Sequence, residues 1–493
     1  SELVEQNNIF HASYEIDKGP ATLITKINVK IEGEGELEPG LKSIVHGHEL
    51  KVGERLIHST YKALKRNLYN VAFSEGYLDA EFTQSTLNVG RNNQQAEIAL
   101  VLDTGPKYYF GPITIEQDIL IIKFVKHFIE IHEGDAFDSD KLLNLKFALT
   151  DSGYFNDVEV IAQKDDSVDY HIPVTVKTHP VRPRKYSAGI GFGTDTGPRG
   201  NLGVEFLRFN ERGHKANINL RASAIKSELS SQYTIPIRDI TKDQFVINAS
   251  ASDEEFADGD GDSEKLSVGI SQNVNLHSWR RKFYLNLDQE DFTLGEDEDE
   301  TTLLYPGMTL SRSRADDALF TRKGYSFSID FHGGVENIIS NTSFFNTRIN
   351  TAAVLPITAK SRLLLRSQFG VADANDFNEL PPSQRFFAGG DRSVRGYDYR
   401  DIGPRDNNGE NVGGKYLYEA SIETDYLVYK NFGGAIFFDA GNAEDELSWD
   451  PQKAAGVGFR WASPVGMARL DFAFPLDGDD RGLHFHISVG PDL

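Results

Sequence analysis

Cysteine is absent from the 493 residues of the chain, and no run of apolar residues is long enough to form a membrane-spanning helix. The missing cysteine excludes disulfides, thiolate metal sites and cysteine nucleophiles. A transmembrane helix needs about 18 or more consecutive apolar residues, so a helical membrane protein is excluded too. Positive charge is also scarce, with 51 Lys and Arg against 74 Asp and Glu and a formal net charge of −23. We therefore expect no nucleic-acid partner.

Enzyme signatures are missing as well. The sequence has no G-x-S-x-G, no H-E-x-x-H and no phosphate-binding P-loop, and its 13 His are scattered without metal-ligand spacing. We therefore expect a protein that is not an enzyme and that holds no cofactor or metal. The N-terminal SELVEQNNIF also lacks the basic segment and apolar core of an export signal. Such a signal was either removed from this numbering or never existed.

Two segments of related pattern fill the first part of the chain. Residues 21–105 run strand, helix, strand, strand, and the same order recurs in residues 106–180. Gly76 and Gly153 occupy equivalent places, where a glycine can end a helix in the left-handed conformation before the next strand. We predict two related α+β modules, preceded in residues 1–20 by the remnant of a further module.

Strict alternation of apolar and polar residues replaces helical spacing in residues 181–493. About sixteen such segments follow one another, which suits membrane strands of roughly 9 to 11 residues. The strands of a soluble β-sandwich also alternate apolar and polar residues. Domains of that kind, however, usually divide into smaller domains beyond roughly 250 residues. The polar faces carry charges that favour a wet lumen: Arg221, Asp330, Glu419, Glu423, Arg460, Arg469 and Asp471. We predict an all-β, about 16-stranded antiparallel transmembrane β-barrel after the α+β modules.

Acidic residues concentrate in two runs between predicted strands, residues 253–264 and 295–300. We interpret both as solvated extracellular loops. The first run fails as a calcium-binding EF-hand loop, because Gly269 stands where that loop needs a glutamate.

The longest stretch without alternation is residues 374–414, which are rich in arginine and aromatic residues. A loop of this length and composition is typically functional rather than disordered. In the following strand, Phe437, Asp439 and Gly441 share one face, because side chains alternate along a strand. If that face looks inward, Arg395 is the natural counter-ion of the carboxylate, and Gly396 lets the backbone approach closely.

Two motifs carry a resemblance to a known family. RFFAGGDRSVRGYDYR (residues 385–400) resembles the VRG[FY] signature of the BamA-like outer-membrane insertase and two-partner-secretion superfamily, and FFDAG (residues 437–441) resembles its F-x-D-x-G signature. Within that superfamily, GTDTGPR, GVGFRWASPVG and the terminal HFHISVGPDL are similar to the TamA family, the outer-membrane subunits of translocation and assembly modules. The resemblance covers nearly the whole chain. It implies a sixteen-stranded barrel in the bacterial outer membrane and POTRA modules of β-α-α-β-β type in the periplasm.

The resemblance also implies roles for individual residues. Inside the barrel, Arg395 of the VRGY motif, which continues with Gly396 and Tyr397, would pair with Asp439, and Phe437 and Gly441 would complete its pocket. The family is further known for a weak seam between the first and last strands. Here the seam residues would be Gly189, Gly191 and Gly193 on one side, and Leu483, Phe485, Ile487 and Gly490 on the other.

The glycines give a physical reason for a weak seam, because glycine destabilises strands. An open seam would expose two strand edges, each a template for an incoming strand. The alternative interpretation is that these glycines only relieve crowding in the lumen.

These observations predict an outer-membrane protein assembly and translocation factor. It would insert or secrete β-barrel clients such as autotransporters through the seam, in contact with the lipid bilayer and a TamB-like periplasmic partner. Two alternatives stay open: an export pore of the two-partner-secretion type, and envelope lipid transport with TamB. Clients captured at the seam would favour assembly, and clients captured by lumen residues such as Arg221 would favour export.

Overall fold

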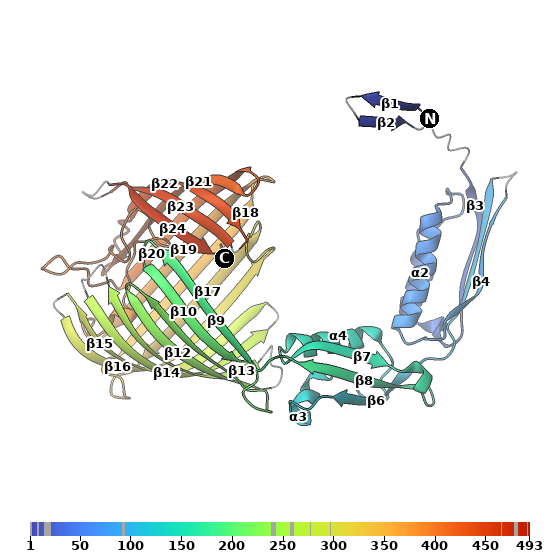
Figure 1. Ribbon diagram of the computed structural model, residues 1–493, viewed down its shortest axis with the longest axis horizontal. Helices are drawn as coiled ribbons and strands as arrows, with labels where there is room; N and C mark the ends of the chain where they lie inside the picture. Colours follow the sequence, from blue (N-terminus) through green and yellow to red (C-terminus); the bar gives the residue numbers. More distant parts are fainter. Residues whose placement is uncertain are drawn as a thin grey trace. The chain divides into compact units, whose positions relative to one another are not determined.

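The computed structural model describes residues 2–6, 9–13, 21–90, 94–237, 243–256, 261–276, 278–295, 297–464, 466–477, 482–490 and 492–493. The chain divides into two compact units, Ser1–Pro180 and Val181–Leu493 (Figure 1). None of the helices in the described ranges is both long and apolar enough to cross a membrane.

The first unit contains two copies of one β-α-α-β-β arrangement. The first copy comprises β3 (Leu23–Glu32), η1 (Glu34–Leu37), α1 (Pro39–Gly47), α2 (His58–Ser74), β4 (Glu81–Val89) and β5 (Gln95–Asp103). The second comprises β6 (Tyr109–Glu116), α3 (Ile122–Val125), η2 (Lys126–Phe128), α4 (Ser139–Asp151), β7 (Phe155–Ala162), η3 (Lys164–Asp166) and β8 (His171–Pro180). In each sheet the last strand is central, parallel to the first strand and antiparallel to the middle one. Before them, β1 (Glu2–Gln6) and β2 (Ile9–Ser13) form an antiparallel hairpin.

Helix α2 shows why these residues form a module. Tyr61, Leu64, Leu68 and Ala72 recur at helical spacing and are buried against the sheet, with Ile98 and its neighbours on β5. The helix ends at Ser74, and Gly76 two residues later has a φ of +91°, in the left-handed region; Gly153 has a φ of +76° at the equivalent place after α4. The predicted left-handed conformation of both glycines is confirmed.

The second unit is one antiparallel sheet of 16 strands, in which each strand pairs with its neighbours in chain order (Figure 1). The strands are β9 (Arg184–Gly193), β10 (Gly197–Phe206), β11 (Lys215–Ser223), β12 (Lys226–Pro236), β13 (Asp243–Phe256), β14 (Gly261–Leu276), β15 (Trp279–Leu294), β16 (Asp297–Ala315), β17 (Gly324–Gly334), β18 (Phe344–Pro356), β19 (Ser361–Ala374), β20 (Tyr416–Tyr429), β21 (Phe432–Glu444), β22 (Gln452–Ser463), β23 (Gly466–Pro475) and β24 (His484–Gly490). The predicted fold class, α+β modules followed by a barrel of about sixteen strands, is confirmed.

Burial along the strands is the reverse of burial in a water-soluble protein. On β14, Leu266, Val268 and Ile270 are 47–54% exposed, whereas Ser267 and Ser271 between and beside them are buried. Apolar side chains on the outside and polar ones on the inside are the pattern of a barrel whose outer surface meets hydrocarbon.

The acidic runs differ from the prediction, because much of each run is strand rather than loop. Asp253–Phe256 continues β13, Gly261–Glu264 begins β14 and Asp297–Glu300 begins β16. In the first run, Glu254 forms ion pairs with Lys226 at 2.6 Å and Arg400 at 2.9 Å, which compensate its charge at the end of the hairpin.

Candidate functional site

The long loop between β19 and β20, residues 375–415, packs into the barrel lumen. Five of its apolar side chains are buried against apolar residues of the barrel wall such as Leu303 and Phe344; they are Leu380, Phe386, Ala388, Val394 and Ile402. The lumen is therefore filled by the loop, and not by water, where these side chains pack. The reason is that the wall presents small and apolar side chains there, among them Ala372, Ala443 and Ala454, and these leave room for the loop.

Arg395 lies at the centre of the loop's polar contacts, with a side chain that is 2% exposed. Its Nε donates to Asp439 Oδ2 at 2.7 Å and its Nη2 to Asp439 Oδ1 at 3.0 Å, a two-pronged arrangement that suits a planar guanidinium. The guanidinium carbon lies 3.5 Å from the ring centroid of Phe437, close enough for a cation–π interaction. The structure thus brings together three residues that the sequence singled out.

Three further charged residues complete this group, and the sequence alone did not connect them with Arg395. Nη1 of Arg395 also donates to Glu423 at 2.8 Å and to Asp471 at 3.0 Å. Arg460 in turn donates to both carboxylates, at 2.7 Å to Glu423. We call Arg395, Arg460, Glu423, Asp439 and Asp471 the arginine cluster.

The interpretation of Glu423 as part of a hydrated wall is wrong, since the residue is 5% exposed. Burial opposes ionisation of a carboxyl group unless cations compensate. Two guanidinium groups provide that compensation here.

The other predicted residues of the loop and its receiving strand have distinct surroundings. Gly396 has a φ of +100°, and its N–H donates to His486 Nε2 at 3.0 Å. The hydroxyl of Tyr397 donates to the carbonyls of Lys453 and Asp477 at 3.3 and 3.2 Å. A Cβ on Gly441 would lie 2.8 Å from the carbonyl oxygen of Tyr418 on β20, so the neighbouring strand requires a glycine there.

The predicted seam lies between the two ends of the 16-stranded sheet. In the strands that the structure describes, β9 and β24 form no ladder with each other, although every other adjacent pair does. β24 has 7 residues against 10 in β9, and Leu483 precedes it. Phe485 is exposed, Ile487 is half-buried, and Gly490 ends the strand opposite Met467 of β23.

The glycine face of β9 is covered by side chains of β10. Cβ atoms on Gly189 and Gly191 would meet the side chains of Asn201 and Arg199, respectively. A Cβ on Gly193 would lie 3.2 Å from Thr196 Oγ1 in the turn. These contacts agree with the alternative interpretation, in which the glycines relieve crowding.

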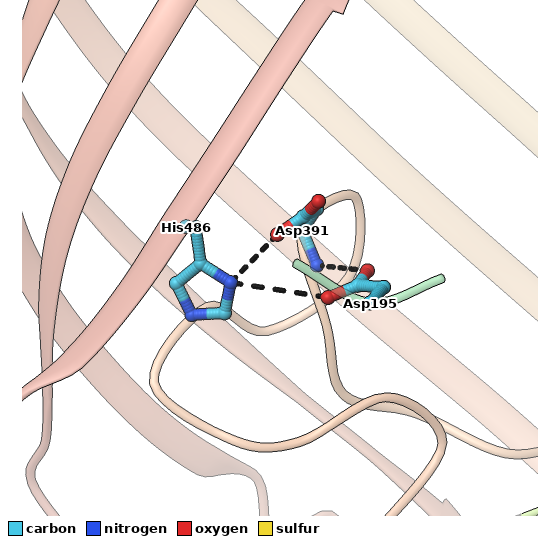
Figure 2. A group of neighbouring side chains, drawn as sticks. All are labelled: Asp195, Asp391 and His486. Atoms are coloured by element: carbon cyan, nitrogen blue, oxygen red, sulfur yellow. Dashed lines mark hydrogen bonds and ion pairs between the residues drawn. The ribbon is translucent and has the colours of Figure 1, made fainter. Parts of the chain in front are cut away.

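A second polar group lies at the end of β9, where the seam meets the loop (Figure 2). The Nδ1 of His486 lies 2.7 Å from Asp391 Oδ1 and 3.9 Å from Asp195 Oδ1. Burial and the charge of Asp391 raise the pKa of Asp195 to about 7. Burial opposes ionisation of Asp391 too, but hydrogen bonds from His486 and Thr194 lower its pKa.

These three side chains are also the one group of three or more possible metal ligands among the described residues. The hydrogen bond from Gly396 N–H occupies the lone pair of His486 Nε2. In a neutral imidazole the proton then sits on Nδ1, which donates to Asp391 and has no lone pair left for a metal. The arrangement is that of a hydrogen-bonded group rather than a metal centre.

A third polar group holds the residues after β24. Asp492 accepts a hydrogen bond from Arg362 of β19 at 2.7 Å and also contacts Arg469 of β23. Arg362 is 2% exposed, pairs with Asp425 of β20 and stacks on Phe320 at 4.2 Å. Asp492 stands in the terminal HFHISVGPDL, where neither alternation nor motif spacing indicates this role.

Comparisons with known proteins agree with this architecture. The family model described as the Omp85 superfamily domain matches residues 209–492. The chain is 26% identical over 455 residues to the outer membrane protein assembly factor BamA of Nitratidesulfovibrio vulgaris, and the alignment covers 85% of this chain and 56% of that protein. It is 22% identical to BamA of Neisseria meningitidis serogroup B, with 90% and 63% covered. The chain therefore spans less than two thirds of the length of these curated relatives.

Among solved structures, the crystal structure of BamA from Haemophilus ducreyi lacking POTRA domains 1-3 is similar, with a TM-score of 0.82. The sequences are 16% identical, and the alignment covers 95% of this chain and 99% of that one. At this identity the likeness supports the fold.

Proposed function

Because the chain belongs to the Omp85 superfamily, we propose that it is an outer-membrane assembly factor that inserts β-barrel clients through the seam between β9 and β24. The single observation that supports this proposal most is the unpaired seam in an otherwise fully paired sheet. Unpaired strand edges carry unsatisfied N–H and C=O groups, and a client strand can satisfy them by β-augmentation. The role is non-enzymatic, since it exchanges hydrogen bonds and breaks no covalent bond.

The filled lumen favours insertion through the seam over export through the pore. A chain passing through the lumen would have to displace the apolar contacts of the loop and separate the arginine cluster, in which Arg395 is 2% exposed. Removing one partner of a buried ion pair costs about 3–5 kcal/mol. A client that enters at the seam does not have to pass between the loop and the barrel wall.

The finer assignment to the TamA family, with a TamB-like periplasmic partner, is also part of the proposal. It is supported by the motifs in residues 193–199, 456–466 and 484–493 and by the two α+β modules, which would lie in the periplasm. The edge strands of the modules offer a second place for β-augmentation.

Co-purification tests this assignment. A TamB-like protein should co-purify with the full chain and should be lost when β4 carries a proline on its exposed edge. Co-purification of BamA-type accessory proteins alone would count against the assignment. Envelope lipid transport with TamB would appear as lipid exchange between vesicles without any client.

A crosslinked seam tests the main proposal. Phe192 of β9 and Val489 of β24 are exposed by 53% and 45%, and the chain has no native cysteine. We replace both with cysteine, join them with a short reducible bis-thiol crosslinker and reconstitute the protein in vesicles. Folding of a urea-denatured barrel client, followed by heat-modifiable gel mobility, is expected to stop and to recover after reduction.

The matched control joins strands that are already paired. Ala188 and Leu202 are register partners on β9 and β10, so a crosslink between cysteines at these positions leaves the seam free. Client folding is expected to continue in the control. If the seam-crosslinked protein folds clients at the control's rate, insertion through the seam is refuted. Clients that crosslink to a cysteine at Arg221 rather than to either edge would instead support an export pore.

A further inference from the structure

The seam is joined by side chains at one end instead of by a ladder. We propose that Asp391 is the residue through which the long loop holds the seam shut, so that the seam opens when Asp391 leaves its place between Thr194 and His486. This inference deepens the proposed function, on which it rests, by naming what releases the seam. We call Thr194, Asp195, Asp391, His486 and Ile487 the seam clasp.

One oxygen atom of the loop connects the two sides of the seam. Oδ1 of Asp391 accepts a hydrogen bond from Thr194 Oγ1 at 2.8 Å, in the turn after β9. The same oxygen accepts from His486 Nδ1 on β24 at 2.7 Å (Figure 2). A carboxylate is suited to this position, because each of its oxygens has two lone pairs and its charge strengthens both bonds.

Thr194 also contacts the backbone of β24. Its hydroxyl group donates its single proton to Asp391 and accepts a hydrogen bond from the backbone N–H of Ile487 at 3.2 Å. That last bond joins the turn after β9 to β24 directly. If Asp391 withdraws, the hydroxyl is free to rotate, and its bond to the backbone of β24 loses its fixed direction.

The loop is shaped to bring Asp391 to this place. The backbone N–H of Asp391 donates to Asp195 Oδ2 at 2.7 Å. Gly390, immediately before it, has a φ of +108°, and a Cβ there would lie 2.7 Å from the same carboxylate oxygen. A residue with a side chain at position 390 would therefore push the loop away from the turn after β9.

The clasp is linked to the arginine cluster through one imidazole ring. His486 donates from Nδ1 to Asp391 and accepts at Nε2 from the N–H of Gly396, the residue after Arg395. Both hydrogen bonds of the ring thus go to the loop. A loop that moves out of the arginine cluster must release His486 on both sides, which removes both hydrogen bonds that this ring makes to the loop.

Water can reach the clasp, so its bonds can break and re-form. A cavity of about 440 Å³ adjoins it, lined in part by Asp195, Leu483, His484 and His486. Polar groups that lose their protein partners can be solvated there, which lowers the cost of opening.

A distance measurement across the seam tests the proposal in the absence of any client. Spin labels on cysteines at Tyr186 of β9 and Val489 of β24 report the separation of the two strands by pulsed electron paramagnetic resonance. We compare the full chain with Asp391→Ala and Thr194→Val in lipid nanodiscs. Each variant is expected to raise the ratio of long to short distances at least about tenfold, the loss expected for one hydrogen bond to a charged group. The double variant is expected to add little to either single one, because both remove the same connection.

The matched control is Asp398→Ala. Asp398 is a loop aspartate that also faces a histidine of β24, with 3.7 Å between its Oδ1 and His484 Nδ1, but it makes no bond to the turn after β9. The control is expected to keep the distances of the unchanged protein. Unaltered distances in Asp391→Ala would overturn the proposal, and so would widening in Asp391→Ala without widening in Thr194→Val. If the seam closes only when Zn²⁺ is added and opens again with EDTA, the group is a metal site and the proposed clasp is wrong.

The two proposals fail in different ways. If client insertion is unaffected by the seam crosslink while Asp391→Ala still widens the distances, the proposed function is wrong and the clasp stands. If the crosslink stops insertion but the distances do not respond to Asp391→Ala, the clasp is wrong and the proposed function stands.

Discussion

The carboxylate of Asp492 accepts a hydrogen bond from Arg362 at 2.7 Å, although Arg362 stands on β19 and Asp492 follows β24. Four strands separate β19 from β24 in the sheet. The pair therefore connects Asp492 with a strand that lies five positions from β24 in the sheet. Arg469 also contacts Asp492, so the carboxylate is held from two sides.

We predict that Asp492→Ala loosens the residues after β24 and lowers the thermal stability of the barrel. The expected loss in the free energy of unfolding is about 2 kcal/mol, because Arg362 loses a charge-assisted hydrogen bond but keeps Asp425. The temperature at which the folded, faster-migrating form disappears on gels measures this loss. Asp373→Ala is the control: its ion pair with Lys415 is exposed and should contribute less than about 1 kcal/mol. Equal melting of the two variants would refute the anchoring role of Asp492.

Replacing Arg395 with alanine should leave a folded barrel with a loosened loop. The substitution leaves Asp439 without its guanidinium partner and removes one of the two partners of Glu423 and of Asp471. Uncompensated buried carboxylates cost about 3–5 kcal/mol, and the loop can avoid this cost by leaving the lumen. Limited proteolysis within residues 375–415 is expected to become at least tenfold faster. Unchanged cleavage together with unchanged client insertion would show that the arginine cluster does not hold the loop.

Gly456→Ala should have a related effect without touching a charge. A Cβ at this position of β22 would overlap the ring of Phe437, on which the guanidinium of Arg395 rests, and the carbonyl oxygen of Phe472 on β23. Overpacking of this kind costs about 1–3 kcal/mol. The control is Gly434→Ala on β21, where the nearest atom to the new Cβ is a carbonyl oxygen 3.6 Å away. The proteolysis assay for residues 375–415 should respond to the first substitution and not to the second.

The contact between the two α+β modules should weaken in acid. Asp79 of the first module accepts from Lys164 and from Tyr108 of the second module, the latter at 2.7 Å, and these hydrogen bonds, that from Lys164 first, lower its pKa. A lowered folded-state pKa gives stability that is complete above the ordinary aspartate value and is lost as the pH falls through the folded-state value. Asp79→Asn should therefore speed hydrogen exchange in residues 76–80 and 160–166 at pH 7, and the difference from the unchanged protein should shrink as the pH falls below the ordinary aspartate pKa and vanish in strong acid. The contribution at pH 7 is less than about 1 kcal/mol, since the pair is partly exposed. A difference that persists in strong acid would contradict this account.

The sequence alone was sufficient to predict those features that depend on a single strand or a single helix. Alternation alone places Leu266 outside and Ser267 inside, and the pattern around Gly76 is enough to end a helix. The pairing of Arg395 with Asp439 needed the resemblance to a family, because 44 residues separate the two in the chain.

Contacts that depend on several strands at once could not be predicted in this way. Alternation shows that Glu423 and Asp471 face the lumen, but not that they lie at the same height, which depends on the register of β20 to β23. The seam clasp is harder still: 197 residues separate Thr194 from Asp391, and 95 separate Asp391 from His486. No local pattern marks any of the three.

The even number of antiparallel strands places the start of β9 and the end of β24 at the same rim of the barrel. A polypeptide with an even number of strands can enter a bilayer as a series of hairpins. Neither end of the barrel segment then has to cross the hydrocarbon. The tips of the hairpins must cross instead, and several of them bear acidic residues, among them those of β13–β14 and β15–β16. Since moving a carboxylate through the bilayer centre costs several kcal/mol, the acidic tips raise the electrostatic barrier to the protein's own insertion.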